Sequence, residues 1–301
     1  MGLATAPRPT GQLERVRRTV ALLERRGYAV PPQRLAEVCL GGEISALEVR
    51  FAVAASDGEL REAEGLVVSP ALGARAPAIR RRTDDHAAAA AGYLPETLRF
   101  ARRVIELCPY VLSLSIAGSL ASGGFQETDD VDLNLVVEDG RRHLAYVAVN
   151  LLGYLHAARF RGKPIDASTR RPLAPRLMTL NLVLERSQCF PLRRQDEDMA
   201  FELLQSEPIF GAAFLRRVAV ANPGLTEAFP QLASKTAVVE VLPRARLPAA
   251  LFPRLLDAPS RTFGKAAWRY MQWTRRGSPE ARARVAFVRE TMRPYTLFLD
   301  S

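Results

Sequence analysis

The chain has 301 residues, a length that permits about two domains. Of these residues, 48% are hydrophobic and 25% are charged, a balance typical of a soluble globular protein. Its formal net charge of +10 comes almost wholly from arginine and favours a polyanionic partner or substrate. There is no run of 18 apolar residues and no hydrophobic signal core at the N-terminus, which argues against a membrane or secreted protein and predicts a cytoplasmic one. The three widely spaced cysteines lack metal or disulfide spacing, so reduced core thiols are expected.

Residues 1–12 are expected to form a disordered tail, and residues 13–75 to form a separate module. Apolar residues at helical spacing predict one helix ending before Gly27 and a second after Pro31-Pro32. Ser45-Ala-Leu-Glu48 is a capping box that opens a third helix, and residues 59–69 suit a hairpin. Three helices followed by a hairpin resemble a winged helix-turn-helix. Because the third helix has few cations, a packing or protein-contact role is favoured, and DNA binding stays the alternative.

Residues 75–82 are rich in proline and arginine, which predicts a segment leading away from this module. The stretch Asp84 to Leu107 then has an apolar face at helical spacing and predicts a long helix with a kink near Pro95. We expect it to open a second domain, residues 84–215, by packing beside a sheet.

The stretch Ser113–Glu138, SLSIAGSLASGGFQETDDVDLNLVVE, carries the clearest chemical signal. A short apolar run predicts a buried strand that ends in a turn at Gly118-Ser119. Strand character resumes at Asp130, and a period of two places Asp130, Asp132 and Asn134 on one face of that strand. Two like charges side by side require a cation, and carboxylate ligands suit Mg²⁺ or Mn²⁺.

This pattern, with Gly118-Ser119, ten further residues and then Asp130-Val-Asp132-Leu, resembles the signature of the DNA polymerase β-like nucleotidyltransferases. The resemblance implies an α/β (α+β) fold, with a mixed sheet flanked by helices. It also implies two metal ions held by the two aspartates, and transfer of a nucleoside monophosphate from a nucleoside triphosphate with release of pyrophosphate. Gly118 and Ser119 are expected to hold the β- and γ-phosphates.

Three other interpretations of these residues are less favoured. A calcium loop would need glycine where Leu135 stands and a bidentate glutamate where Arg141 stands. A P-loop would need Lys-Ser/Thr in place of Gly124-Phe125. A surface hairpin with solvated acids does not require the Gly-Ser turn at this distance.

The strand predicted at residues 175–185 is the natural place for the third acid of a polymerase β-like site, but Asn181 stands at its centre. An amide cannot act as a base at neutral pH, so Asn181 is the main departure from the pattern. Glu185 faces the same side but lies too far along an unbent strand. Three cations between the two strands, Lys163, Arg170 and Arg171, are weaker candidates for contacts with the triphosphate.

Residues 198–230 extend the resemblance to an uncharacterised bacterial group of this superfamily that has an N-terminal winged-helix-like part. Residues 216–301 are expected to form a helical C-terminal region. Within it, the helix 261–276 carries several aromatic residues among arginines, a mixture that can stack bases. At helical spacing such residues more often belong to a core.

Together these features predict a metal-dependent nucleotidyltransferase whose acceptor is a nucleic-acid end, a protein hydroxyl or a small molecule. Asp130, Asp132 and Asn181 are the expected catalytic positions. The alternative is a weakened member of the superfamily, which binds nucleotide or nucleic acid without turnover because Asn181 has replaced the base.

Overall fold

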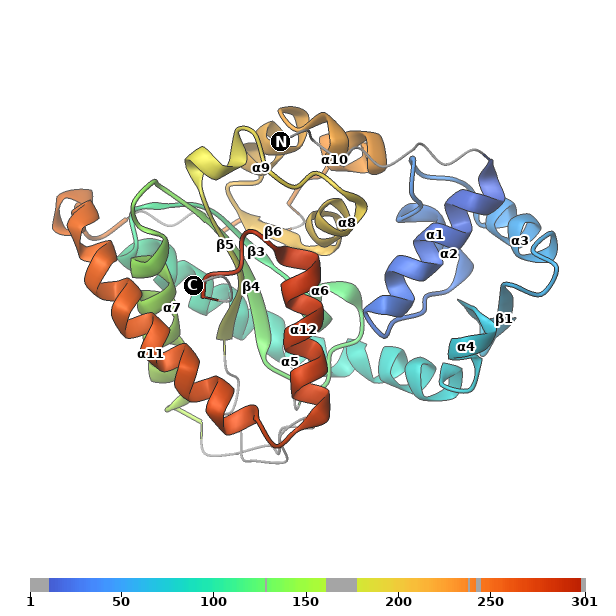
Figure 1. The fold of residues 1–301 in the computed structure, drawn as a ribbon, viewed down its shortest axis with the longest axis horizontal. Coiled ribbons are helices and arrows are strands. Elements are labelled where there is room, and N and C mark those ends of the chain that lie inside the picture. Colours follow the sequence, from blue (N-terminus) through green and yellow to red (C-terminus); the bar gives the residue numbers. More distant parts are fainter. Residues whose placement is uncertain (1–10, 128, 161–177, 238, 242–244, 299–301) are drawn as a thin grey trace.

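A four-stranded mixed sheet with helices on both faces forms the centre of the computed structural model (Figure 1), which describes residues 11–127, 129–160, 178–237, 239–241 and 245–298. The strand order is β5-β4-β3-β6. Strands β4 and β5 run parallel, while β3 is antiparallel to both β4 and β6. The predicted mixed α/β fold is therefore confirmed. The strands span Val111–Ile116 (β3), Val131–Val137 (β4), Met178–Glu185 (β5) and Glu207–Phe210 (β6).

One face of the sheet is apolar and packs on two helices, α5 (Ala76–Leu107) and α7 (Arg142–Ala157). Val131, Leu133 and Leu135 of β4 are fully buried in that core. Because neighbouring side chains on a strand alternate between faces, the polar residues between them point to the opposite side. The predicted alternation along β4 is confirmed.

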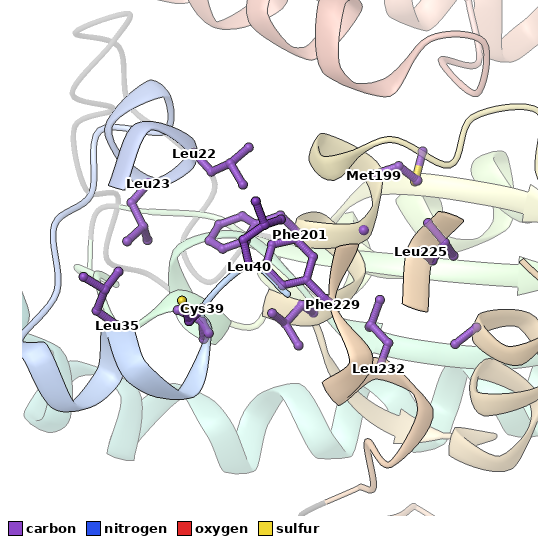
Figure 2. Close-up of a cluster of buried hydrophobic side chains, with 14 of the residues drawn as sticks. Leu22, Leu23, Leu35, Cys39, Leu40, Met199, Phe201, Leu225, Phe229 and Leu232 are labelled. Carbon is purple, nitrogen blue, oxygen red and sulfur yellow. The ribbon is translucent and has the colours of Figure 1, made fainter. Parts of the chain in front are cut away.

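The opposite face of the sheet shares a second core with both the middle and the beginning of the chain. Leu182 and Leu184 of β5 join side chains from α8 (Glu197–Gln205) and α10 (Pro223–Ala228) in this core. Figure 2 shows Leu22 and Leu40 from the N-terminal segment beside Phe201 of α8 and Phe229. The N-terminal helices are thus held against the sheet layer by a continuous apolar cluster.

The N-terminal module has the order of elements that the sequence predicts. The capping box at Ser45 is present, with Glu48 N–H donating to the serine hydroxyl and the serine N–H donating to the Glu48 carboxylate. The outer side of the third helix carries exposed Leu47 and Phe51. Its identity as a winged helix stays a prediction. The elements are α1 (Gln12–Arg25), α2 (Pro32–Glu37), α3 (Ala46–Ala54), β1 (Arg61–Ala63) and β2 (Leu66–Val68).

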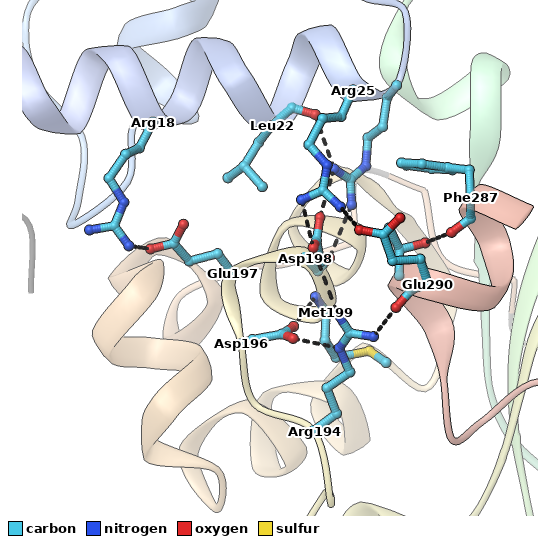
Figure 3. Close-up of polar contacts among 12 residues, drawn as sticks. Arg18, Leu22, Arg25, Arg194, Asp196, Glu197, Asp198, Met199, Phe287 and Glu290 are labelled. Atoms are coloured by element: carbon cyan, nitrogen blue, oxygen red, sulfur yellow. Dashed lines mark hydrogen bonds and ion pairs between the residues drawn. The ribbon is translucent and has the colours of Figure 1, made fainter. Parts of the chain in front are cut away.

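Ion pairs between α1 and the start of α8 supplement this apolar contact (Figure 3). Asp198 accepts hydrogen bonds from Arg25 at 2.9 Å and from Arg26 at 3.3 Å, and Arg18 pairs with Glu197. Arg26 and Asp198 are nearly buried, so these charges are shielded from water. Burial lowers the pKa of Arg26, and the nearby carboxylates of Glu202 and Asp198 oppose that shift.

Residues 75–82, predicted as the segment that leads away from the N-terminal module, contain the first turns of α5, which begins at Ala76. Pro77 is tolerated there since the first turn of a helix needs no intrahelical N–H partner. The helix continues through Pro95 as one 32-residue element. It therefore links the N-terminal module directly to the sheet.

The C-terminal region is helical, as predicted, and its helix α11 (Asp257–Arg275) packs on α7. Asp257 accepts hydrogen bonds from the backbone N–H groups of His143 and Leu144 and faces Nδ1 of His143 at 2.7 Å. Burial acts to raise the pKa of Asp257, but these hydrogen bonds outweigh it and leave the pKa below its usual value. Asp257 thus caps the start of α7.

The remaining helices are short or follow the sheet. Of the helices in the described ranges, none combines the length and the apolarity that a bilayer crossing requires. The remaining helices are α4 (Pro70–Gly73), α6 (Gly118–Ser122), η1 (Arg186–Cys189), α9 (Ala212–Val220), η2 (Pro230–Ala233), η3 (Ala249–Leu251), η4 (Arg254–Leu256) and α12 (Pro279–Met292).

Candidate functional site

The carboxylates of Asp130 and Asp132 converge on one hydroxyl group. Oγ1 of Thr179 lies 3.1 Å from Oδ2 of Asp130 and 3.1 Å from Oδ1 of Asp132. Those two oxygens are therefore no farther apart than twice that distance. The pairing of β4 with β5 explains the geometry, because Asp132 and Thr179 are direct partners in the parallel register. The two predicted acids are held together at one end of the sheet.

The Gly118 turn lies directly against this pair. A Cβ atom at Gly118 would be 2.2 Å from Oδ2 of Asp132, and φ at Gly118 is +60°, in the left-handed region. The backbone N–H of Ala117 also donates to the carbonyl of Asp132 at 2.8 Å. Only glycine lets the turn approach the carboxylate so closely. The predicted neighbourhood of turn and acids is present in the fold.

The hydroxyl of Ser119, expected to hold phosphate, binds the carboxylate of Asp129. This hydroxyl donates to Oδ2 of Asp129 at 2.9 Å, and the same oxygen accepts from the backbone N–H of Gln126 at 3.2 Å. Arg82 of α5 pairs with this oxygen at 2.7 Å and donates to the carbonyl of Gly124. Asp129 therefore fastens the loop after α6 to α5, and its role is structural. A role for Ser119 in phosphate binding stays a prediction.

Asn181 occupies a β-bulge on β5. Leu133 pairs with Leu180 and Asn134 pairs with Leu182, so Asn181 is the extra residue of the bulge. Its side-chain amide donates to Oδ1 of Asn134 at 3.2 Å and to Oε1 of Glu202 at 2.8 Å. Asn134 also donates to Oε1 of Glu202, at 3.3 Å. The side chain at the position expected for a third acid, Asn181, thus binds the carboxylate of another residue, Glu202.

Glu202 comes from α8 and lies on the face of the sheet opposite α5 and α7. We call this the polar face, because the side chains of Asp132 and Asn134 project from it. The carboxylate of Glu202 acts electrostatically on Arg26, whose guanidinium lies 5.1 Å from the ring centroid of Phe201 and 5.6 Å from that of Phe287. The N-terminal module, α8 and α12 therefore meet beside the row of polar side chains on β4 and β5. This arrangement gives the face a third carboxylate that sequence spacing does not reveal.

Three predicted phosphate contacts, Lys163, Arg170 and Arg171, lie outside the described residues. Among the residues that are described, no three His, Cys, Asp or Glu side chains gather closely enough to hold a metal ion. The two aspartates nevertheless fit a hard cation. A threonine hydroxyl has one proton and can donate fully to only one carboxylate at a time, so Thr179 does not by itself neutralise the pair. Asp130 forms no ion pair with any described residue.

Comparison of the chain with protein-family models, curated proteins and solved structures found no match. Asp130, Asp132 and Gly118 come together as predicted, and Asn181 lies on the neighbouring strand, two residues beyond Thr179.

Sequence reasoning missed three residues of the site. Thr179 had a signal, because it is two residues from Asn181 on the same expected strand. Asp129 had no such signal, since the sequence pattern gives a role only to Asp130 and Asp132, which follow it. Glu202 had none either, because its approach to Asn181 depends on how α8 folds back over the sheet.

Proposed function

We propose that the chain is a metal-dependent nucleotidyltransferase that moves a nucleoside monophosphate from a nucleoside triphosphate to an acceptor hydroxyl. The observation that carries this proposal is the convergence of Asp130 and Asp132 on Thr179, with the Gly118 turn against Asp132. Two Mg²⁺ or Mn²⁺ ions, when bound, would neutralise charge on the triphosphate and lower the pKa of the acceptor hydroxyl.

The residues of the chain have distinct tasks in this scheme. Asp130 and Asp132 provide the negative field that holds the cations, and Thr179 fixes the orientation of both carboxylates. Gly118 keeps side-chain atoms away from Asp132, so that the triphosphate tail can approach the turn. In the reaction, the acceptor oxygen bonds to the α-phosphorus, the bond from that phosphorus to the bridging oxygen of the β-phosphate breaks, and pyrophosphate leaves.

The acceptor hydroxyl must also lose a proton, and Asn181 cannot accept it. Glu202 would take this proton, since its carboxylate is held by Asn181 and Asn134 on the same face of the sheet as the aspartates. Glu202 keeps lone pairs beyond the two hydrogen bonds that it accepts from these amides. In this scheme, Asn181 positions the base.

A second candidate is a protein that binds nucleotide without turnover. Its support is the hydrogen-bond network of Asn181, Asn134 and Glu202, which ties up the only third carboxylate that the described residues place beside the amides. In that case the site would retain a nucleotide, and label transfer would be absent.

The test is incubation of the purified protein with each α-labelled nucleoside triphosphate and either Mg²⁺ or Mn²⁺, with RNA, protein and small-molecule hydroxyls as acceptors. The expected result is labelled acceptor together with pyrophosphate. Both should be lost in Asp130→Asn/Asp132→Asn and retained in Asp84→Asn, which removes an exposed acid of α5. Nucleotide binding without transfer supports the second candidate, and absence of both binding and transfer would overturn the proposal.

A further inference from the structure

Helix α11 exposes an aromatic stripe on the side that faces away from α7. Phe263 and Tyr270 are each 66% exposed, and Trp273 is 54% exposed. These rings recur at spacings of seven and three residues, so they lie along one side of the helix. The expectation that the aromatic residues of this helix belong to a core is therefore wrong for these three. Large apolar rings that remain in contact with solvent along one line indicate a binding surface.

The end of this stripe is already arranged as a stack of flat groups. The rings of Tyr270 and Trp273 have centroids 6.0 Å apart and an interplanar angle of 28°. The guanidinium of Arg276 lies 5.0 Å from the ring centroid of Trp273. Tyr270, Trp273 and Arg276 thus form a row of planar surfaces to which another flat group can add.

The charge of this helix is entirely positive beyond its first residue. No Asp or Glu occurs between residues 258 and 279, a stretch that contains four arginines and one lysine besides four aromatic residues. Arg261, Arg269 and Arg276 are exposed. The one acid of α11, Asp257, is occupied by His143 and Leu144. The exposed face of α11 therefore offers cations between rings and carries no acid of its own.

We propose that the exposed face of α11 binds single-stranded nucleic acid, with bases stacking on Phe263, Tyr270 and Trp273 and phosphates contacting the neighbouring arginines. Unpaired bases present flat faces with phosphates between them, which matches the alternation of rings and cations on this helix. A protein partner of ordinary composition would satisfy the rings but would leave a row of arginines without counter-charges. The formal net charge of +10 adds long-range attraction for any polyanion.

This surface is separate from the candidate catalytic site. Helix α11 packs on α7 (Figure 1), and α7 covers the apolar face of the sheet. Asp132 shares the opposite face with Asn134, which contacts Glu202 of α8. The inference therefore does not depend on the proposed transfer reaction. Loss of the aspartates should leave binding to α11 unchanged.

The test compares two fluorescein-labelled oligonucleotides of about 15 nucleotides, one with thymine bases and one abasic with the same number of phosphates. Fluorescence anisotropy with the full chain should show tighter binding of the oligonucleotide that carries bases. Trp273→Ala and Tyr270→Ala should each weaken that binding roughly 5- to 100-fold and leave abasic binding nearly unchanged, since stacking contributes per base. Trp273→Phe should keep most of the affinity.

Two controls separate this surface from the rest of the molecule. Tyr154→Ala removes an exposed ring of α7 that is not part of the stripe and should leave both affinities unchanged. Asp130→Asn/Asp132→Asn should also bind the oligonucleotide normally, so failure of the transfer reaction and failure of this inference are distinguishable. Equal affinity for the two oligonucleotides would overturn the inference. So would a dimer in sedimentation that dissociates in Trp273→Ala, because the stripe would then be a protein interface.

Discussion

The side-chain amide of Asn181 donates a hydrogen bond of 2.8 Å to Oε1 of Glu202. The strand position at which the sequence pattern expects an acid therefore binds an acid supplied by α8. The amide cannot be exchanged for a carboxylate without placing two like charges in contact.

The substitution Asn181→Asp should reduce stability and should not increase label transfer. It replaces a donor to a charged acceptor by a second anion, at a cost of about 2 kcal/mol. Repulsion raises the pKa of the new carboxylate pair, so the loss should be small near pH 5 and should grow as the pH rises toward 7.5. Urea denaturation at the two pH values measures it.

The neutral variant Asn181→Ala serves as the control, because it removes the donor without adding charge and should show little dependence on pH. Faster transfer by Asn181→Asp than by the natural chain would contradict this prediction. It would mean that the site simply lacks a third acid.

The substitution Gly118→Ala should abolish label transfer. The added Cβ atom would lie 2.2 Å from Oδ2 of Asp132 and would displace that carboxylate. Alanine at a positive φ also costs about 1–2 kcal/mol of stability. Transfer assays together with thermal unfolding would measure the two effects.

Gly123→Ala is the matched control for backbone strain. Gly123 also has a positive φ, +86°, but no atom lies within 4 Å of an added Cβ. It should lose similar stability to the backbone strain and keep its activity. Equal loss of transfer in both variants would refute a specific contact between the turn and Asp132.

The substitution Asp198→Asn should lower the free energy of unfolding by about 3 kcal/mol, because it removes the carboxylate that pairs with the nearly buried Arg26 and leaves that guanidinium only the electrostatic attraction of Glu202. Glu290→Gln, which removes the exposed partner of Arg25, should cost less than about 1 kcal/mol. Both can be measured by urea denaturation followed by circular dichroism and tryptophan fluorescence.

The two probes should give the same transition in each variant, since α1 and α8 share one core. Separate transitions for the N-terminal module and the sheet would show instead that the predicted boundary near residue 75 divides two independent folding units.

The substitution Lys235→Met should increase stability at neutral pH. Lys235 lines an apolar pocket with Leu203 and Leu215, and burial lowers its pKa from 10.5 to about 8, although Glu207 opposes this shift. That difference corresponds to about 3 kcal/mol, which is an upper limit because the variant also loses a hydrogen bond to the carbonyl of Leu204.

The stability of the natural chain should itself rise between pH 8 and 10.5, because the unfolded lysine still binds a proton there and the folded one does not. The advantage of Lys235→Met should therefore shrink as the pH increases. Lys265→Met makes the same change of charge on α11 and should show no such trend. A constant advantage at all pH values would contradict the assignment.

Short-range patterns predicted the elements around the site well. The alternation of Asp130, Val131 and Asp132 is a local property of a strand, and the apolar residues of that strand are buried as expected. The turn at Gly118 was predictable because glycine adopts the required φ without strain.

Features that depend on long-range packing were not predictable. Residues 75–82 were predicted only to lead away from the N-terminal module, yet residues 76–82 are the first turns of α5, since the helix accepts Pro77 in its first turn. Glu202 reaches Asn181 only because α8 folds back over the sheet. The rings of α11 have core-like spacing, and periodicity cannot tell a buried face from an exposed one.

The hydrophobic core that the sheet shares with the N-terminal helices has a consequence for biosynthesis. It joins Val16 near the start of the chain to Met292 and Tyr295 near its end. A ribosome must therefore release residues 16 to 295 before this core can close. Until then, the apolar side of α1 stays uncovered in the nascent chain, which makes the early segment a natural client for chaperones.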